Sequence, residues 1–219
     1  MKANSDLQEK VLKALHWEPT LDTSQIGVMV DNGIVLLTGF VDSYAKKLKV
    51  EATVKNVKGV KAVVEKVEVR FGIEDEISDS EIAREVVNAL KWNWEIPNDV
   101  IKVKVENNWV TLEGQLQWNY QRETAQKLVD NLVGVRGVNN KLTIKTELHD
   151  KIEKDLILAA IARDWSINDD EIDVTVLDKN VTLTGLVHSL YQKHQAEKIV
   201  WSTPGVWYVD NNLEVGFDD

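Results

Sequence analysis

One pair of glycines recurs three times along the chain, and this repeat constrains the fold more than any other feature. The first glycine of each pair closes the second of two strand-like runs, and the second follows 20 residues later. The pattern recurs after 75 and then after 71 residues. This period exceeds a solenoid unit and matches a small domain, so it predicts three tandem domains. The six glycines, which we expect to have structural roles, are Gly39, Gly59, Gly114, Gly134, Gly185 and Gly205.

The composition is that of a globular protein without thiol chemistry. The 219 residues are 43% hydrophobic and include no cysteine, which excludes disulfides and thiolate catalysis. No run of about 18 apolar residues occurs, so we expect no transmembrane segment. The start, Met1 to Asp6, lacks the apolar core of a signal peptide. We therefore expect a cytoplasmic protein, or a periplasmic one if a leader has been removed.

The charge is acidic and unevenly distributed. The chain has a net charge of −10, with +2 on residues 1–72, −5 on residues 73–150 and −7 on residues 151–219. No long basic stripe is present to displace counterions from phosphates. This distribution excludes nucleic-acid binding as the main activity.

Each unit has the same order of predicted elements. In the second unit, apolar residues recur at helical spacing over 86–90 and 125–132, and alternate along the runs 101–105, 110–112 and 138–144. The sequence predicts an α+β protein of three tandem small α-β-β-α-β domains, each with a three-stranded sheet packed against two helices. The predicted domains are 5–72, 78–147 and 151–217.

Short-range signals predict where these elements turn and begin. Asn32-Gly33 is a strong hairpin signal, because both turn residues must adopt positive φ. Ser5 and Ser78 lie where helix N-caps are expected. We expect the first glycine of each pair where a side chain would obstruct a bend or bulge. The second is expected to end the second helix as a left-handed cap.

The strand and glycine motifs resemble the BON (bacterial OsmY and nodulation) domain. VLLTGFV at 35–41 is followed by GVKAV at 59–63. The second copy is similar to the family pattern almost throughout, with VTLEGQL at 110–116 and GVRGVNNKL at 134–142. The third copy has VTLTGLV at 181–187. The first departs at Glu65, where the others have Asn140 and Asn211.

The resemblance implies a non-enzymatic protein without catalytic residues or cofactors. The family is associated with osmotic and envelope stress, with binding of phospholipid surfaces, and in some members with chaperone-like or ion-sensing roles. An ion-sensing or small-ligand function for this chain rests on that resemblance alone.

The outward faces of the second helices are the candidate binding surfaces. Lysines beside large apolar side chains suit an interfacial helix, although each cation contributes only about 1 kcal/mol near an anionic membrane. The matching face of the second unit (Asn119, Glu123, Lys127 and Asp130) is predicted to be solvated. The candidate residues are Tyr44, Lys46, Lys47, Leu48, Lys49 and Lys55 in the first unit, and Leu190, Lys198 and Trp201 in the third.

Two kinds of partner fit these faces. One is an anionic phospholipid surface, bound through the lysine-rich first unit. The other is a protein, in which case Leu190 and Trp201 serve a protein-interaction or chaperone-like scaffold. In a simpler interpretation, Leu48 and Trp201 pack against a neighbouring repeat or a second chain, and the lysines form a solvated rim.

The tryptophans divide into two groups. Trp17 and Trp92 occupy equivalent positions after the first helix, and Trp94 corresponds to Trp165, which predicts packing at the helix end. The remaining four lack aromatic counterparts and are candidates for external contacts. They are Trp109, Trp118, Trp201 and Trp207.

Catalytic and metal-binding motifs are missing from the sequence. His188 and His194 are six residues apart, which places them on no common helical face and leaves a zinc site short of ligands. The acidic run 169–171 with Asp173 lacks the glycine and distant glutamate of a calcium loop. No phosphate-binding glycine loop or nucleophile elbow occurs. We therefore expect no enzyme activity, cofactor or metal.

Overall fold

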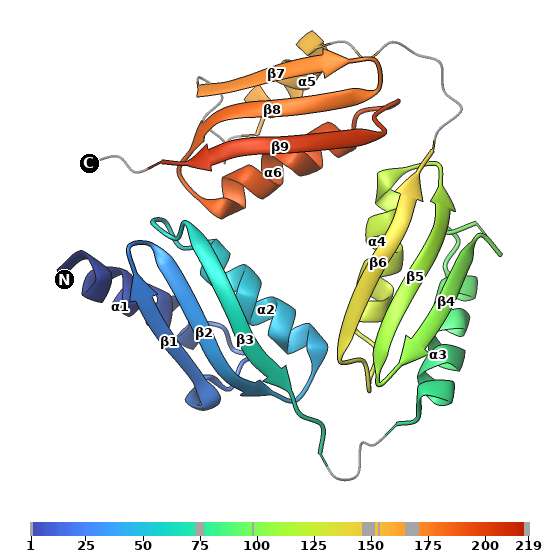
Figure 1. The fold of residues 1–219 in the computed structure, drawn as a ribbon, viewed down its shortest axis with the longest axis horizontal. Helices are drawn as coiled ribbons and strands as arrows, with labels where there is room; N and C mark the ends of the chain where they lie inside the picture. Colours follow the sequence, from blue (N-terminus) through green and yellow to red (C-terminus); the bar gives the residue numbers. More distant parts are fainter. Residues whose placement is uncertain are drawn as a thin grey trace. The chain divides into compact units, whose positions relative to one another are not determined.

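The computed structural model describes residues 2–72, 77–97, 99–145, 152, 154–164 and 171–216. It contains three three-stranded sheets, one in each predicted repeat, with helices packed beside every sheet (Figure 1). The α+β class and the α-β-β-α-β order are therefore confirmed. One short 3-10 turn, η1 (Thr23–Gln25), is added in the first repeat.

The three repeats have closely similar element lengths. The first contains α1 (Lys2–His16), β1 (Ile26–Asp31), β2 (Ile34–Val41), α2 (Tyr44–Lys55) and β3 (Ala62–Val69). The second contains α3 (Asp79–Trp92), β4 (Ile101–Glu106), β5 (Trp109–Leu116), α4 (Asn119–Asp130) and β6 (Gly137–Ile144). The third contains α5 (Lys154–Ala162), β7 (Ile172–Leu177), β8 (Asn180–Val187), α6 (Leu190–Trp201) and β9 (Tyr208–Val215).

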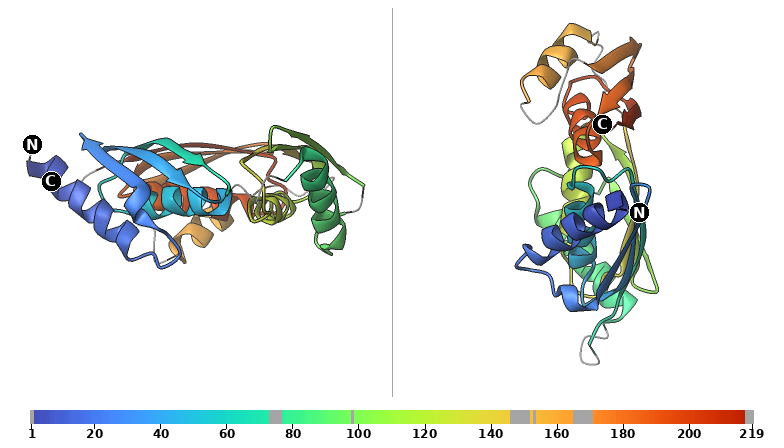
Figure 2. Two further views of the ribbon diagram at one scale, coloured as in Figure 1. Left: turned by 90° about the horizontal axis from the view of Figure 1, so that it is seen from below. Right: turned by 90° about the vertical axis from the view of Figure 1, so that its left-hand side faces the viewer.

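The second strand is central in every sheet. In the second and third repeats it pairs antiparallel with the first strand through a hairpin and parallel with the third strand. The parallel pairing requires a crossover connection, which the second helix provides. The helices of each repeat lie on one face of its sheet (Figures 1 and 2). We call the other face of each sheet its open face.

The core of each repeat forms between the sheet and its helices. Alternate strand residues point toward the helices, and in the third repeat Val174, Leu183 and Leu213 are buried with Ile157 and Val200. The predicted apolar stripe of α4 is confirmed at Ala125 and Val129, which are fully buried, whereas Leu128 and Leu132 are half-buried. The equivalent residues of the other second helices, Val50, Val54, Ala196 and Val200, are also fully buried. Helix and sheet thus close a small interior within each repeat.

The hairpin turns and one N-cap agree with the sequence. Asn32 and Gly33 both have positive φ, 50° and 83°, as the predicted turn requires. Ser78 caps α3 through a complete capping box with Glu81. The N-cap prediction for Ser5 is wrong, because α1 begins at Lys2 and Ser5 lies inside the helix.

The first glycine of each pair adopts a backbone conformation that a side chain would strain. Gly39, Gly114 and Gly185 have φ of 113°, 154° and 122°. A Cβ atom on Gly185 would overlap the carbonyl oxygen of Glu171, and one on Gly114 would overlap that of Val100. Because these carbonyls belong to backbone, they have little freedom to move aside. The expected close approach is therefore present.

The second glycine of each pair is left-handed, but it does not end the helix. Gly59, Gly134 and Gly205 have φ of 102°, 85° and 90°, as expected. The helices end four residues earlier, at Lys55, Asp130 and Trp201. Each glycine is instead the third residue of a β-turn, closed by the hydrogen bonds Val60 N–H to Val57, Val135 N–H to Leu132 and Val206 N–H to Thr203. A turn of this kind needs positive φ at its third residue.

We expect Gly185→Ala to destabilise the third repeat by at least about 2 kcal/mol, because the new methyl group meets a carbonyl and the backbone disfavours it. Gly216→Ala is a matched control in the same repeat, because its Cβ would make an ordinary 3.6 Å contact with Leu186. Hydrogen exchange of peptides from β7 to β9 measures the difference. Equal protection in the two variants would contradict this role of Gly185.

Candidate interaction surfaces

The predicted face on α2 is less exposed than expected. Lys49 is exposed, but Tyr44 and Leu48 are half-buried. Lys46, Lys47 and Lys55 are also half-buried. The expectation of fully outward apolar side chains is therefore wrong for Tyr44 and Leu48.

Two lysines of α2 are held in local ion pairs. The Nζ of Lys46 lies 2.6 Å from a carboxylate oxygen of Asp42, and the Nζ of Lys55 lies 2.6 Å from one of Glu51. Both pairs have the i, i+4 spacing at which opposite charges meet on a helix. These contacts neutralise part of the positive charge that the sequence places on this face.

The corresponding face on α6 also differs from the prediction. Lys198 is exposed, whereas Leu190 is half-buried. Trp201 is half-buried and packs against the core of its own repeat. Its outward direction was predicted wrongly, because the large indole at the last position of the helix reaches back over the edge of the core.

The equivalent face on α4 is not fully solvated. Asn119 is only 6% exposed, so its predicted exposure is wrong, and its amide donates to Glu123 at 2.9 Å. Lys127 is exposed as expected. Burial raises the pKa of Asp130, although the hydrogen bond that it accepts from Gln126 at 2.6 Å acts in the opposite direction.

Two asparagines attach the third strand to the second helix. The amide of Asn211 donates to the carbonyl of Lys193 at 2.9 Å and to Glu197 at 3.2 Å, and its oxygen accepts from the N–H of Leu213. Asn140 makes the equivalent contact with the carbonyl of Arg122. Glu65 in the first repeat has no amide to donate. The asparagines thus position α4 and α6, of which only α6 carries a candidate face.

The helix starts contain glutamines that the sequence analysis missed. In the second repeat, Gln121 is buried and accepts from the N–H groups of Gln117 and Trp118, each at 3.2 Å. In the third, Gln192 accepts from the N–H of His188 at 2.7 Å. A sequence signal for these side chains exists: in both repeats the glutamine follows the last buried residue of the central strand, Leu116 or Val187, by five positions. These side chains satisfy backbone donors before the helix begins.

The tryptophans after the first helices do not pack as predicted. Trp17, Trp92 and Trp94 are 84%, 87% and 90% exposed, so the expected helix-end packing is wrong for them. Trp165 lies outside the described residues. The chain leaves the helix in these segments without folding back over the indoles.

The tryptophans without counterparts are partly accessible. Trp118 is half-buried. Trp207 is exposed, and the Nζ of Lys179 lies 4.3 Å from its ring centroid. Trp109 is also exposed at its edge, but its ring covers Gly137, where a Cβ would lie 2.5 Å from the indole. None of these contacts by itself indicates a ligand.

The open faces of the sheets differ more between repeats than the helix faces do. The central row of the first repeat is Met29, Leu36 and Val64, as placed by equivalence with the second repeat. The row in the second repeat is Lys104, Thr111 and Asn139, and in the third it is Thr175, Thr182 and Asp210. The sequence analysis considered only the strand residues that point into the core, and it therefore missed this difference between the open faces.

The described residues show no metal site. Among them, no group of three or more histidine, aspartate or glutamate side chains could hold a metal ion. Asp173 instead accepts from Lys154 at 2.9 Å, and this hydrogen bond lowers the pKa of Asp173. Residues 169 and 170, the start of the acidic run, lie outside the described residues. In the parts of the chain that can be described, no helix is long and apolar enough to cross a membrane.

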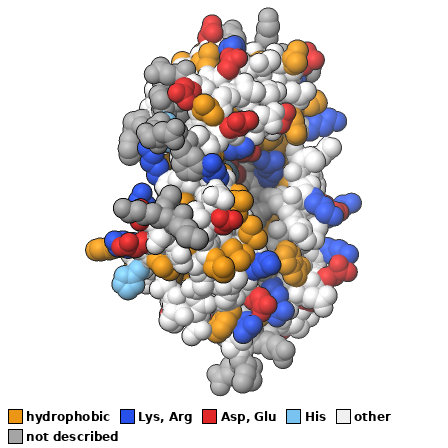
Figure 3. All heavy atoms as spheres, turned by 60° about the vertical axis from the view of Figure 1, so that its left-hand side comes forward, with side chains coloured by type: hydrophobic (Ala, Val, Ile, Leu, Met, Phe, Trp, Pro, Cys, Tyr) orange, Lys and Arg blue, Asp and Glu red, His pale blue; other side chains and the backbone are white. Residues whose placement is uncertain are grey.

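The exposed apolar side chains are interspersed with charges. On the face drawn in Figure 3, hydrophobic side chains of the described residues lie singly or in small groups among basic and acidic ones. Such a distribution is ordinary for a protein surface. Individual rows, such as the one on the first sheet, therefore matter more than the total apolar area.

The three repeats share one fold with matching strands and glycines, and this agrees with a comparison against protein families. The model of the BON domain matches residues 3–70, 78–146 and 149–216. The chain belongs to the BON domain family. The resemblance seen in the sequence is thereby confirmed for all three repeats.

Two individual proteins are similar to this chain at low sequence identity. The chain is 28% identical over 146 residues to the Osmotically-inducible protein Y of Escherichia coli (strain K12), a match that covers 65% of this chain and 73% of that protein. Among solved structures, CdsD, a structural protein of the type III secretion system of Chlamydia trachomatis, is 17% identical over 95% of this chain and 91% of that chain. The TM-score of 0.26 is too low for a structural argument.

We expect Asn211→Ala to destabilise the junction of α6 and β9 by about 1–2 kcal/mol, because helix acceptors lose their donor. The neighbouring Asn212→Ala is the control, because the amide of Asn212 donates to Asp210 on the exposed side of the strand at 3.0 Å. That change should stay within about 0.5 kcal/mol. Native-state hydrogen exchange of α6 measures the difference between the two variants. Equal effects of both variants would contradict the assigned role of Asn211.

Proposed function

We propose that this BON-domain protein is a non-enzymatic, osmotic- or envelope-stress-related protein that binds an anionic phospholipid surface. Membership of the family supports the binding role, and the name of the Escherichia coli relative supports the link to osmotic stress. The segments 5–72, 78–147 and 151–217 act as separate modules in this proposal. Binding takes place in the cytoplasm, or in the periplasm if a leader has been removed.

One observation carries the phospholipid proposal: cations are concentrated on the first repeat. That repeat has a net charge of +2, in contrast to −5 and −7 on the other two segments. Four lysines lie on α2 alone: Lys46, Lys47, Lys49 and Lys55. On the third repeat, the exposed Lys198 with Leu190 and Trp201 forms a smaller contact.

The energetics favour weak and salt-sensitive binding. Each lysine near an anionic leaflet contributes about 1 kcal/mol. Asp42 and Glu51 already neutralise two of the α2 lysines, and the acidic second and third repeats oppose approach to an anionic surface. The half-buried Tyr44 and Leu48 limit the apolar contribution. The exposed Lys49 and its neighbour Lys47 are the contacts that we test in this proposal.

A protein-interaction scaffold is the second candidate function. The exposed Trp17, Trp92 and Trp94 favour it, because tryptophan is enriched in the energetically important parts of protein interfaces. These side chains lie outside the α2 and α6 faces, so a protein partner would use a different surface from the phospholipid.

We expect the protein to sediment with anionic vesicles at about 50 mM salt and to be released at about 500 mM, where exposed charges are screened. Lys47→Gln combined with Lys49→Gln should lower the partition constant by about 25-fold, at about 1 kcal/mol per lysine. Lys127→Gln on α4 is the control and should have little effect.

Two results would count against this proposal. Failure of the wild-type protein to sediment with the vesicles at low salt removes the phospholipid claim. Equal loss of binding in Lys127→Gln removes the assignment to α2 while leaving the ligand class intact.

A further inference from the structure

The open face of the first repeat has an exposed apolar row. Met29 is 66% exposed, and Val64 is also exposed, with the half-buried Leu36 between them on the central strand. Gly27 faces Thr38 across β1 and β2, since a Cβ on Gly27 would lie 2.6 Å from the Thr38 hydroxyl, which supports this register. The exposed Ile34 extends the row along β2.

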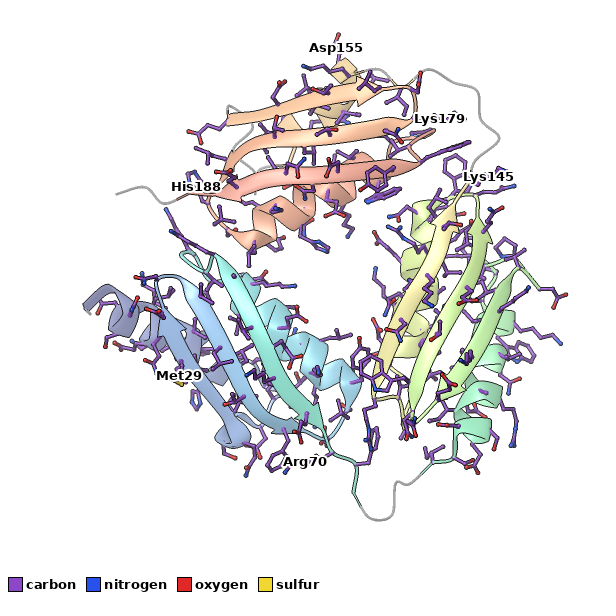
Figure 4. The ribbon with its side chains drawn as sticks, in the orientation of Figure 1. Met29, Arg70, Lys145, Asp155, Lys179 and His188 are labelled. Carbon is purple, nitrogen blue, oxygen red and sulfur yellow. The ribbon has the colours of Figure 1, made fainter. Side chains whose placement is uncertain are left out.

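Cations surround this apolar row. Lys66 is exposed on β3, and Lys61 precedes that strand. The guanidinium of Arg70 lies 4.6 Å from the centroid of the Phe40 ring and pairs with Glu68 at 2.9 Å (Figure 4). With Asp31 and Glu68 as the carboxylates of this face, the cations are in excess.

The open face of the third repeat has the opposite charge. Leu177 is 70% exposed, and Leu186 and Tyr208 are also exposed. Glu214 lies directly beside Leu186 in the strand ladder. The remaining carboxylates are Asp210 and Asp173, the latter paired with Lys154, and the outward positions of β7, β8 and β9 contain no basic residue. The face thus combines apolar side chains with an acidic surround.

The open face of the middle repeat lacks an apolar row. Its open face has the alternating charge row Lys102, Glu113 and Lys141, with 3.5 Å between the last two. Lys104 pairs with Glu106 at 2.8 Å. Charged and polar side chains therefore occupy this face where the first repeat has its apolar row.

We infer that the open face of the first repeat docks onto the open face of the third repeat of a second copy of this chain. Sheets pack face to face through their apolar side chains, at about 10 Å separation. Opposite charges on the two faces favour this pairing, whereas two copies of the first face would bring Lys66 and Arg70 together. The contact is independent of the proposed phospholipid binding, which uses the helices.

The predicted assembly is head-to-tail. Because the two contacting surfaces are different, each docked copy still presents one unoccupied face, and the assembly extends beyond a dimer or closes into a ring. A disabled first face and a disabled third face must therefore complement each other when two variants are mixed. No contact between identical faces has this property.

Light scattering on the full chain over a range of concentrations tests the inference. The wild-type average mass should rise with concentration, more strongly at about 50 mM than at about 500 mM salt. Met29→Asp alone and Leu177→Asp alone should remain monomeric. Their equimolar mixture should reach twice the monomer mass and stop there, because one intact interface remains.

Val133→Asp is the matched control, because Val133 is 68% exposed but lies in a turn of the second repeat. It should associate as the wild type does, and circular dichroism verifies that all variants are folded. A wild-type mass that stays constant with concentration overturns the inference. Association of Leu177→Asp alone also overturns it, because that result means contact between two first repeats. An equal loss of association in Val133→Asp overturns the placement of the contact on the open faces of the sheets.

Discussion

Each repeat depends on one close backbone contact. The central strand passes beside the carbonyl group of the residue just before the first strand of the sheet. Only glycine fits there, as Gly114 and Gly185 show by the overlap that a Cβ would create with Val100 and Glu171. This approach fixes the end of the antiparallel pair. The second helix then starts a few residues later and places its apolar stripe on the sheet. The core is therefore specified by backbone geometry and apolar pattern.

Both proposed functions lie on the surfaces where the copies have diverged. The helix faces differ in lysine content, and the open sheet faces differ in both apolarity and charge. The first repeat contributes to both proposals through opposite sides, with Lys49 on α2 and Met29 on β1. Phospholipid binding and head-to-tail association therefore do not compete for the same side chains. The open face of the middle repeat has two ion pairs, Lys104–Glu106 and Lys141–Glu113, and takes part in neither proposal.

The sequence was sufficient for the fold because apolar periodicity and glycine spacing report directly on burial and backbone conformation. Ala125 and Val129 were placed in the core from their spacing alone, and both are fully buried. Exposure was harder to predict, because it depends on how far a long side chain reaches. Trp201 turned back onto its own core, Trp17 remained exposed, and Asn119 became buried. The same alternation that predicts the core also predicts which strand residues point outward. Which of these residues lie side by side on the open face could be assigned only from the register between strands.

The central claim is that each repeat closes its own core, and the middle repeat tests it most directly. Residues 78–147 would be produced alone and their amide NMR spectrum compared with that of the full chain. At 70 residues, this segment is near the lower limit for an independent core. The account predicts a dispersed spectrum whose peaks from β4, β5, β6 and α4 coincide with those of the full chain. A collapsed spectrum typical of an unfolded segment, in contrast to a folded full chain, would contradict it.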